Sequence, residues 1–366
     1  MQSLKQKLKI STPGRICLFG EHQDYLKLPV IAAAISKRVS VVGVKNSSGK
    51  ISLDLPDIND HDQFVVKEKI PYIKERDYLR SSFNVLVRNG FTFSSGIECV
   101  VIGDIPINTG TSSSSALVVS WINFLALMSD QQKSLSSFEI AEYAHSAEVV
   151  EFGEPGGMMD HFSTSIGGVI HLSTHPLIKI EELNSQIGPF ILANSEEPKD
   201  TRSILARVKQ GILNITEKLS RSYSGFSLHD ITLESLTKFE SNLTDEELRL
   251  LEGTIINKNI TEEAHKLLIN KNYDRYELGK LLNRHQDILR DYLKISTDKI
   301  DRMIDAALDA GALGCKINGS GGGGCMFAYA PDNPEKVLNA VKVIAPESYI
   351  VFVDEGTRFE LNGVEK

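Results

Sequence analysis

Residues 106–116 read PINTGTSSSSA, and they separate a short apolar run, residues 97–102, from a long apolar segment, residues 113–128. This order predicts a strand, a tight glycine-containing loop and a buried helix. Free N–H groups at the start of such a helix present a positive dipole end to an anion, and the serine hydroxyls add donors or a metal ligand. No Lys-Ser/Thr pair follows the glycine, so the loop is not a Walker A loop. A plain serine-capped helix is the alternative interpretation.

A second glycine-rich loop, residues 316–325 (KINGSGGGGC), lies between two short apolar runs further along the chain. Five glycines occupy six consecutive positions. Each glycine costs roughly 0.5–1 kcal/mol of conformational entropy relative to alanine. A backbone that passes close to a ligand, or that adopts positive φ, accounts for such a cost. The loop therefore predicts a ligand contact, with a flexible hairpin loop as the alternative.

The third stretch, residues 13–25 (PGRICLFGEHQDY), joins an apolar strand to a polar turn. Three ionisable residues, Glu21, His22 and Asp24, fall within four positions directly after that strand. Such a cluster suits the hydroxyl groups of a polyol, with Arg15 at the other end of the strand. His22 taken alone is interpreted as a structural hydrogen-bonding residue, but the cluster as a whole predicts an acceptor site.

Composition limits the class of protein. The chain has 366 residues, 41% apolar and 24% charged, with a net charge of −8. The length favours two domains, and the acidic balance argues against a nucleic-acid partner. The longest apolar stretch is too short to span a bilayer, and no signal segment is recognised, so we expect a cytoplasmic protein with no membrane partner. We expect the cysteines to be buried and reduced, without metal-ligand spacing: Cys17, Cys99, Cys315 and Cys325.

The secondary-structure pattern changes along the chain. Strand-like and helix-like segments alternate in the first half, whereas helices dominate from about residue 194. Ser296 or Thr297 is typical of the start of one of these helices, and Gly311 is typical of its end. The other expected elements used below are strands at residues 30–35 and 39–44, and helices at residues 137–152, 201–219, 244–257 and 261–270.

Together these stretches resemble the motifs of the GHMP superfamily, named for galactokinase, homoserine kinase, mevalonate kinase and phosphomevalonate kinase. Residues 13–25 look like the galactokinase signature, with Glu21, His22 and Asp24 at its sugar-contacting positions. Mevalonate kinases share the Gly-Glu-His but lack that aspartate and tyrosine. A fourth match is Glu148, followed twelve residues later by Asp160. The resemblance covers most of the chain.

The resemblance implies an α/β (α+β) fold with two domains. Residues 1–190 would form a ribosomal-protein-S5-like domain with the ATP and acceptor loops, and residues 191–366 a ferredoxin-like domain with extra helices. The implied activity is ATP-dependent phosphorylation of a monosaccharide, favoured at the anomeric hydroxyl, by a galactokinase-like sugar 1-kinase of carbohydrate metabolism. ATP and Mg²⁺ are the implied cofactors.

The resemblance also implies roles for individual residues. Asp160 matches the catalytic aspartate and Arg15 the basic residue paired with it. Ser114 and Glu148 match the magnesium-binding positions, and oxygen ligands are what Mg²⁺ prefers. The implied ATP-binding residues are Gly110, Ser112, Ser113, Ser114, Ser115, Gly321 and Gly322.

Departures from the galactokinase pattern leave the acceptor open. Residues 26–28 (LKL) replace the usual Gly-Gly, and Thr111 replaces a leucine. Residues 194–202 look more like the mevalonate kinase pattern. The alternatives are therefore a mevalonate-type alcohol kinase and a non-catalytic sugar- and ATP-binding regulator. Lys27 and Lys199 raise the further idea of an acidic sugar, and the oligomeric state stays open.

Overall fold

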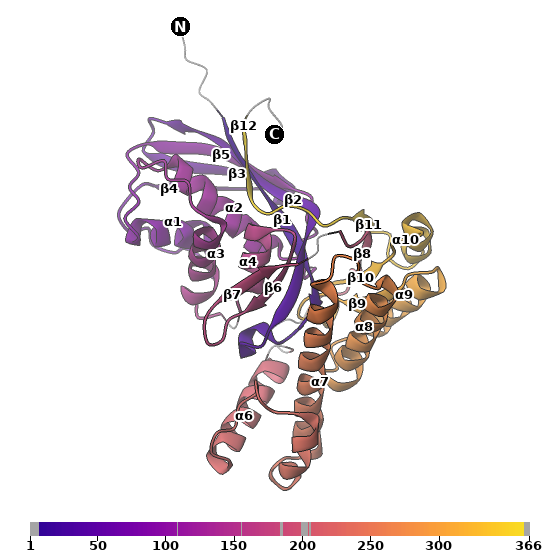
Figure 1. The fold of residues 1–366 in the computed structure, drawn as a ribbon. Coiled ribbons are helices and arrows are strands. Elements are labelled where there is room, and N and C mark those ends of the chain that lie inside the picture. The colour runs from indigo at the N-terminus through magenta and orange to yellow at the C-terminus, as the bar shows by residue number, and fades with distance from the viewer. Residues whose placement is uncertain are drawn as a thin grey trace.

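The structure is a computed structural model that describes residues 7–107, 109–154, 156–183, 186–198, 204 and 206–361. Figure 1 shows two sheets with helices packed against them and a pair of helices, α6 and α7, that extends away from both sheets. The mixed α/β fold class expected from the sequence is confirmed. Lys199 and residues 200–203 lie outside the described residues.

The larger sheet has eight strands among the described residues. Their order is β12-β1-β2-β5-β3-β4, with β6 paired to β2 and β7 paired to β6. The pairings are antiparallel apart from β3 with β5, which is parallel. The strands are β1 (Leu8–Phe19), β2 (Val30–Asn46), β3 (Lys50–Leu55), β4 (Asp60–Val65), β5 (Gly96–Gly103), β6 (Val169–Ser173), β7 (Lys179–Glu182) and β12 (Arg358–Leu361).

Four helices cover this sheet: α1 (Tyr78–Arg88), α2 (Ser113–Met128), α3 (Ser137–His145) and α4 (Met159–Ile166). Helix α2 packs on β1 and β2 and is surrounded by the other three helices. It is apolar on all sides, and Trp121 and Phe124 are fully buried, as expected of a helix enclosed by the core. The helix expected at residues 113–128 is thus confirmed.

The smaller sheet is antiparallel, with the order β11-β8-β10-β9. Its strands are β8 (Phe190–Asn194), β9 (Gly314–Ile317), β10 (Cys325–Tyr329) and β11 (Ser348–Val351). Helices α8 (Arg275–Asp287), α9 (Asp298–Asp309) and α10 (Pro334–Lys342) pack against it. Helices α6 (Gly211–Ser222) and α7 (Asp245–Leu268) pack on each other.

Several element expectations need correction. Residues 30–35 and 39–44 belong to the single strand β2, because β1 pairs with it on both sides of a register shift at Pro13 and Gly14. The helix expected at residues 137–152 changes at Ser146–Val150 into a π-helical turn. The helix after Thr297 is confirmed, since the Thr297 hydroxyl accepts from the backbone N–H of Ile300.

The two helices expected at residues 244–257 and 261–270 are one helix, α7. The polar residues at the expected break do not end it, because Lys258 is buried and satisfied. Its Nζ donates to the backbone carbonyls of Leu228, His229 and Ile231 at 3.3, 2.8 and 2.9 Å. A buried ammonium with three acceptors has no reason to interrupt the helix.

The expected domain division at residue 190 stays a prediction. Strand β8 begins the smaller sheet at Phe190, close to that point, but β12 returns to the larger sheet and pairs with β1. All four cysteines are buried and free, as expected. Within the described residues, no helix is both long and apolar enough to cross a bilayer.

One hydrophobic cluster spans the two sheets. It contains Ile16 and Leu18 of β1 together with Leu192 of β8 and Phe327 of β10. A buried ion pair lies at this junction.

Lys316 of β9 reaches Glu21, just after β1, with 3.0 Å between Nζ and Oε2, and their side chains are 0% and 2% exposed. Lys316 also donates to the carbonyl of Cys17 at 2.8 Å. The pair therefore fixes the glycine-rich loop after β9 against the end of β1.

This pair predicts a stability change. Lys316→Met leaves a buried, uncompensated carboxylate, and removing one partner of a buried pair costs about 3–5 kcal/mol. We expect the free energy of unfolding in urea, followed by Trp121 fluorescence, to fall by that amount. Adding Glu21→Gln should recover part of the loss, because the orphaned charge is gone. A loss below about 1 kcal/mol in the single variant would contradict the argument.

Candidate active site

A cavity of about 130 Å³ lies where the N-terminal polar turn, the first turn of α4 and the second glycine-rich loop meet. The predicted catalytic residues Arg15 and Asp160 line it, and so do the predicted acceptor residues Glu21, His22 and Asp24. These five residues come from two segments about 140 positions apart. The remaining lining residues are Tyr25, Met159, Gly319 and Ser320.

Arg15 and Asp160 form a two-contact ion pair at this cavity. Arg15 Nε donates to Asp160 Oδ1 at 2.8 Å, and its NH2 lies 2.7 Å from the same oxygen. Burial alone would raise the pKa of the Asp160 carboxyl, but the Arg15 charge, aided by His161, holds the pKa below its usual value. The Arg15 side chain is buried, whereas that of Asp160 is 32% exposed. An ionised carboxylate therefore faces the cavity.

The carbonyl of Gly110 connects the serine-rich loop to this pair. It accepts hydrogen bonds from Arg15 NH1 and, at 2.9 Å, from Asn318 Nδ2. Asn318 Oδ1 in turn accepts from the backbone N–H of Cys17 at 2.8 Å. Asn318 thus links all three predicted loops. Its position in the KING segment was the available signal, but no role for it was predicted.

Asp24 is held beside the ion pair by the backbone of the loop before α4. Its Oδ2 accepts from the N–H of Met159 at 2.8 Å. A side chain at Gly157 would place a Cβ 2.1 Å from this carboxyl, so only glycine permits the approach. Burial, opposed by the Met159 hydrogen bond and supported by the charge of Asp160, raises the pKa of Asp24 to about 6. The cavity thus holds two carboxyls with opposite pKa shifts.

His22 and Glu21 hold the glycine-rich loop in place. His22 Nε2 lies 2.9 Å from the Ser320 carbonyl, which can only accept, so Nε2 carries a proton, and Nδ1 lies 2.7 Å from the Tyr25 hydroxyl. Glu21 Oε2 pairs with Lys316 and Oε1 accepts from the Gly319 N–H. Both Glu21 oxygens are therefore used within the protein, which favours a positioning role over the predicted acceptor contact.

Lys209, from a π-helical turn (Ala206–Gln210), was not predicted to lie near the site. Its Nζ is 5.1 Å from the centre of the Tyr25 ring. Burial lowers the pKa of Lys209, and the charge of Asp24 partly offsets this effect. Lys27, which the sequence suggested as a positive charge near an acidic sugar, is exposed and does not line the cavity. Only long-range folding brings Lys209 there.

The serine-rich loop leads to a second cavity, which is separate from the one around Asp160. Ser112 is buried at the N-cap position of the helix in the left-handed conformation (φ 59°), and its side chain makes no capping hydrogen bond. Ser113 and Ser114 line a cavity of about 240 Å³ whose other walls are mainly apolar: Val39, Leu55, Asp57, Ile58, Val101, Gly103, Ile105, Ile107 and Leu117. Ser115 is buried. Thr111 is buried and donates to the Pro106 carbonyl at 3.2 Å, so the departure from leucine is accommodated.

The remaining predicted residues lie around these two cavities. Glu148 is buried, and its Oε2 lies 2.8 Å from Nε2 of His161, the residue after Asp160. Gly321 and Gly322 have positive φ, and the Gly322 N–H donates to the Ile295 carbonyl at 2.7 Å. The roles of these residues toward ATP and a metal stay predictions.

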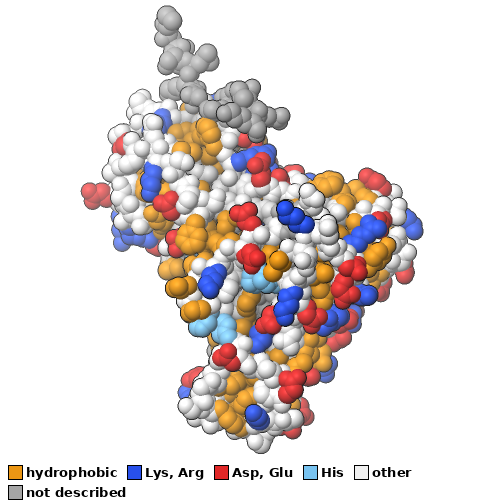
Figure 2. Space-filling model, in the orientation of Figure 1, with side chains coloured by type: hydrophobic (Ala, Val, Ile, Leu, Met, Phe, Trp, Pro, Cys, Tyr) orange, Lys and Arg blue, Asp and Glu red, His pale blue; other side chains and the backbone are white. Residues whose placement is uncertain are grey.

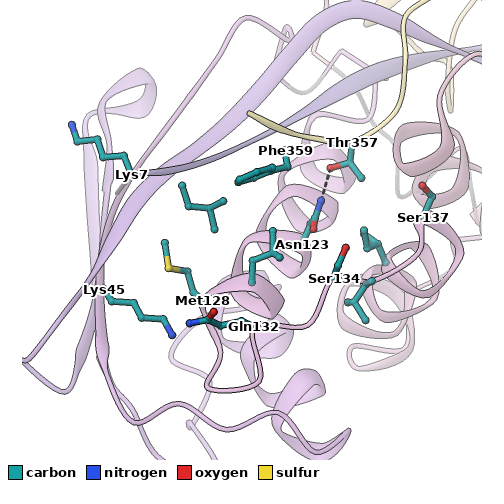
Figure 3. Close-up of a pocket in the computed structure, with 13 residues that line it drawn as sticks. Lys7, Lys45, Asn123, Met128, Gln132, Ser134, Ser137, Thr357 and Phe359 are labelled. Carbon is teal, nitrogen blue, oxygen red and sulfur yellow. Dashed lines mark hydrogen bonds between the residues drawn. The ribbon is translucent and has the colours of Figure 1, made fainter. Parts of the chain in front are cut away.

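A cavity of about 650 Å³ lies apart from this site, and none of the predicted residues lines it. Figure 3 shows its lining, with Lys7 and Lys45 on one side and Ser137 on the other. Asn123 at its centre donates to Thr357 at 3.3 Å. Several of the predicted site residues therefore line the two smaller cavities, and none lines this large one.

The chain matches three family models. Residues 77–168 match the GHMP kinases N terminal domain, and residues 264–344 match the GHMP kinases C terminal model. Residues 4–45 match the galactokinase galactose-binding signature. The three matches contain the strand, loop and helix segments that form the candidate site.

Mevalonate kinases and galactokinases are both among the similar proteins and solved structures. The mevalonate kinase of Pyrococcus abyssi is 30% identical over 360 residues, covering 96% of this chain and 97% of that protein. The galactokinase of Actinobacillus succinogenes is 27% identical over 356 residues, covering 93% and 89%. The structure of Lactococcus lactis galactokinase complexed with galactose matches with a TM-score of 0.83 at 22% identity, covering 96% and 95%. Methanococcus jannaschii mevalonate kinase matches with a TM-score of 0.72 at 18% identity, covering 97% and 100%.

The raised pKa of Asp24 predicts a pH-dependent stability. The folded protein binds this proton more tightly than the unfolded chain, so ionisation costs stability as the pH rises from about 4 to about 6. Asp24→Asn keeps an acceptor for the Met159 N–H and removes that cost. The variant should be more stable than wild type at pH 7.5, by up to about 3 kcal/mol, with no gain near pH 4.

Asp160→Asn is the matched control for this measurement. The pKa of Asp160 is lowered, so its contribution to stability is present above its unfolded pKa and is lost as the pH falls. This variant should lose stability at pH 7.5. Thermal unfolding of both variants across pH measures the two effects, and a destabilised Asp24→Asn at pH 7.5 would contradict the assignment.

Proposed function

The chain belongs to the GHMP kinases, and on this premise we propose that it transfers the terminal phosphoryl group of ATP to the anomeric hydroxyl of a monosaccharide. The observation that carries the proposal is the cavity that holds Asp24 beside the Arg15–Asp160 pair. A polyol offers neighbouring hydroxyl donors to such carboxylates. The cavity volume is below the ~300–1,000 Å³ of drug-sized pockets, which favours a small acceptor.

ATP fits the serine-rich side of α2. The apolar cavity beside Ser113 and Ser114 suits a purine base, and the adjacent helix start suits phosphate oxygens. Gly110 permits the tight turn into that helix, with φ of 90°. The remaining ATP contacts proposed on the sequence pattern are Ser112, Ser115, Gly321 and Gly322.

The donor set fits a magnesium ion. Ser114 presents an exposed hydroxyl, and Glu148 uses Oε2 for His161, which leaves Oε1 to take an ion. A hydroxyl and a carboxylate oxygen are ligands that Mg²⁺ accepts together with phosphate oxygens. When bound, the ion would neutralise charge on the phosphates. His161 would orient the Glu148 carboxylate through its Nε2.

Asp160 would orient the attacking hydroxyl and accept its proton. Its low pKa makes it a weak base, but phosphoryl transfer passes through a loose transition state in which positioning and charge stabilisation dominate. A late proton transfer to an ionised, well-placed carboxylate is compatible with that chemistry. Arg15 would hold the carboxylate in orientation and stabilise the developing negative charge.

A mevalonate-type alcohol kinase is the second candidate. The observation in its favour is that the mevalonate kinase of Pyrococcus abyssi is more similar in sequence than the galactokinase of Actinobacillus succinogenes, at 30% against 27% identity. The match to a galactose-binding signature and the position of Asp24 favour the sugar. Lys209 near Asp24 keeps an acidic sugar among the acceptors to test.

A coupled ADP-release assay tests the proposal with galactose, arabinose, galacturonate, glucuronate, N-acetylhexosamines and mevalonate as acceptors. We expect turnover with at least one sugar and none with mevalonate. Turnover with mevalonate alone establishes the second candidate. No ADP release with any acceptor, despite ATP binding, favours the non-catalytic regulator.

Asp24→Ala should raise the KM for the true sugar by about ten- to a hundredfold, because a lost hydrogen bond to a charged group costs roughly 1.5–3 kcal/mol. The KM for ATP should stay nearly fixed, since Asp24 lies on the acceptor side. Steady-state kinetics with each substrate varied in turn provide the measurement. An unchanged sugar KM would remove Asp24 from the acceptor contacts.

Asp160→Asn should lower kcat by about 10²–10⁴-fold, because the amide keeps the shape but cannot accept the proton. ATP affinity, measured by calorimetry, should be nearly unchanged. The variant would still accept a hydrogen bond from Arg15, so the local geometry is preserved. If it kept more than about a tenth of the wild-type kcat, Asp160 would not be the base.

A further inference from the structure

Three ligand-type side chains, His171, Glu181 and His265, meet outside the candidate active site. His171 lies on β6, Glu181 on β7 and His265 near the end of α7. None of them lines the cavity around Asp160. Figure 2 shows histidine side chains reaching the surface on the face where Figure 1 places these three elements.

The sheet register brings the first two residues together. His171 and Glu181 are direct partners in the antiparallel pairing of β6 with β7, so their side chains leave the same face of the hairpin. Side chains directly opposite each other in this way have Cβ atoms about 4.5–5.5 Å apart.

Helix α7 adds the third group to that face. The His265 ring stacks on the His171 ring, with 3.9 Å between centroids and 20° between planes. His265 Nε2 lies 2.8 Å from Glu181 Oε2. One ligand atom from each of the three residues lies within 4.8 Å of the others.

We propose that His171, Glu181 and His265 bind a divalent transition-metal ion of the zinc class. Two imidazole nitrogens and one carboxylate oxygen are a recurrent three-ligand set for Zn²⁺, with water in the fourth position. Imidazole also suits Co²⁺, Ni²⁺ and Cu²⁺, whereas Mg²⁺ prefers oxygen ligands only. The site is therefore chemically distinct from the Ser114 and Glu148 pair.

Side-chain rotation is needed to receive the ion, because the stacked rings of His171 and His265 must each turn a nitrogen toward a common point. Metal–ligand bonds of about 2.0–2.2 Å require ligand atoms roughly 3–3.5 Å apart in a tetrahedral site. The contact between His265 and Glu181 is already shorter than that, and the ion would replace the proton that joins them. The Glu181 side chain is 50% exposed and that of His265 is 23% exposed, so both have room to move and water has access.

The bound ion would fasten the β6–β7 hairpin to α7. The hairpin belongs to the larger sheet, where β6 pairs with β2. Helix α7 belongs to the pair of helices, α6 and α7, that extends away from both sheets. An ion that binds the folded chain and not the unfolded one stabilises the fold by mass action. This inference does not depend on the proposed function, because no residue of the candidate active site takes part.

A second pair of stacked histidines provides a matched control. His175, after β6, stacks on His229, with 4.2 Å between centroids and 20° between planes. Among the residues that the structure describes, three ligand groups meet at the His171 cluster and not at this pair. The control pair thus has two stacked imidazoles without the third ligand.

The test is calorimetric titration of the full-length, chelator-treated protein with ZnCl₂ in excess Mg²⁺ and without ATP. We expect one equivalent of Zn²⁺ to bind. His265→Ala and Glu181→Gln should each weaken binding by at least about tenfold, since even residues behind metal ligands are worth that much. His229→Ala should bind Zn²⁺ like wild type. With Co²⁺ as the probe, the visible absorption of a tetrahedral site should appear in wild type and in His229→Ala only.

Thermal unfolding with and without Zn²⁺ separates metal binding from a folding defect. Each variant should unfold near the wild-type temperature in chelator, and Zn²⁺ should raise the midpoint only where the three ligands are intact. Glu181→Gln is the conservative variant if His265→Ala does not fold. Equal Zn²⁺ affinity in all variants, which is adventitious surface binding, or equal losses in His229→Ala and His265→Ala, would overturn the proposal.

Discussion

The candidate site depends on the buried ion pair between Lys316 and Glu21. Two charges that are almost fully excluded from water are tolerated only when each has a partner and its hydrogen bonds are complete. Lys316 satisfies this by binding Glu21 and the Cys17 carbonyl, and Glu21 also accepts from the Gly319 N–H. The smaller sheet and the end of β1 can therefore be joined in one arrangement. That arrangement sets the position of the glycine-rich loop.

The glycine-rich loop in turn positions residues that line the cavity. The Ser320 carbonyl fixes the protonated nitrogen of His22, and His22 meets the Tyr25 hydroxyl next to Asp24. Two of the carboxyls that line the cavity then have opposite pKa shifts: Arg15 lowers the pKa of Asp160, whereas burial raises the pKa of Asp24. Carboxyl pairs whose environments move their pKa values apart are a recurrent mark of functional sites. Ionisation of Asp24 lowers the stability of the folded protein, because burial shields this binding group from water.

The reaction class and the acceptor rest on different parts of the molecule. Several groups proposed to act on phosphate lie on elements of the shared core: Arg15 on β1, Ser114 on α2 and Asp160 on α4. Relatives with two different names share this fold. The acceptor side is built from short turns and from Lys209, which come from regions that vary more readily than packed strands. A kinase fold is therefore easier to assign than its alcohol.

The sequence by itself determined the chemistry of the loops and the buried helix α2, because glycine content, apolar runs and motif spacing are local properties. The pairing of Arg15 with Asp160 was expected only from the resemblance to the GHMP superfamily, since the two residues are far apart in the chain. The sequence could not determine that β2 and α7 are continuous. The continuity of β2 depends on its pairing with β1, and that of α7 on the hydrogen bonds of the Lys258 ammonium, and both are long-range contacts. Nor could it determine that Glu21 is paired with Lys316, that burial raises the pKa of Asp24 to about 6, or that His265 lies beside the His171–Glu181 pair of β6 and β7. Burial, strand register and the approach of distant segments arise only when the chain is folded, so those features were decided by the tertiary structure.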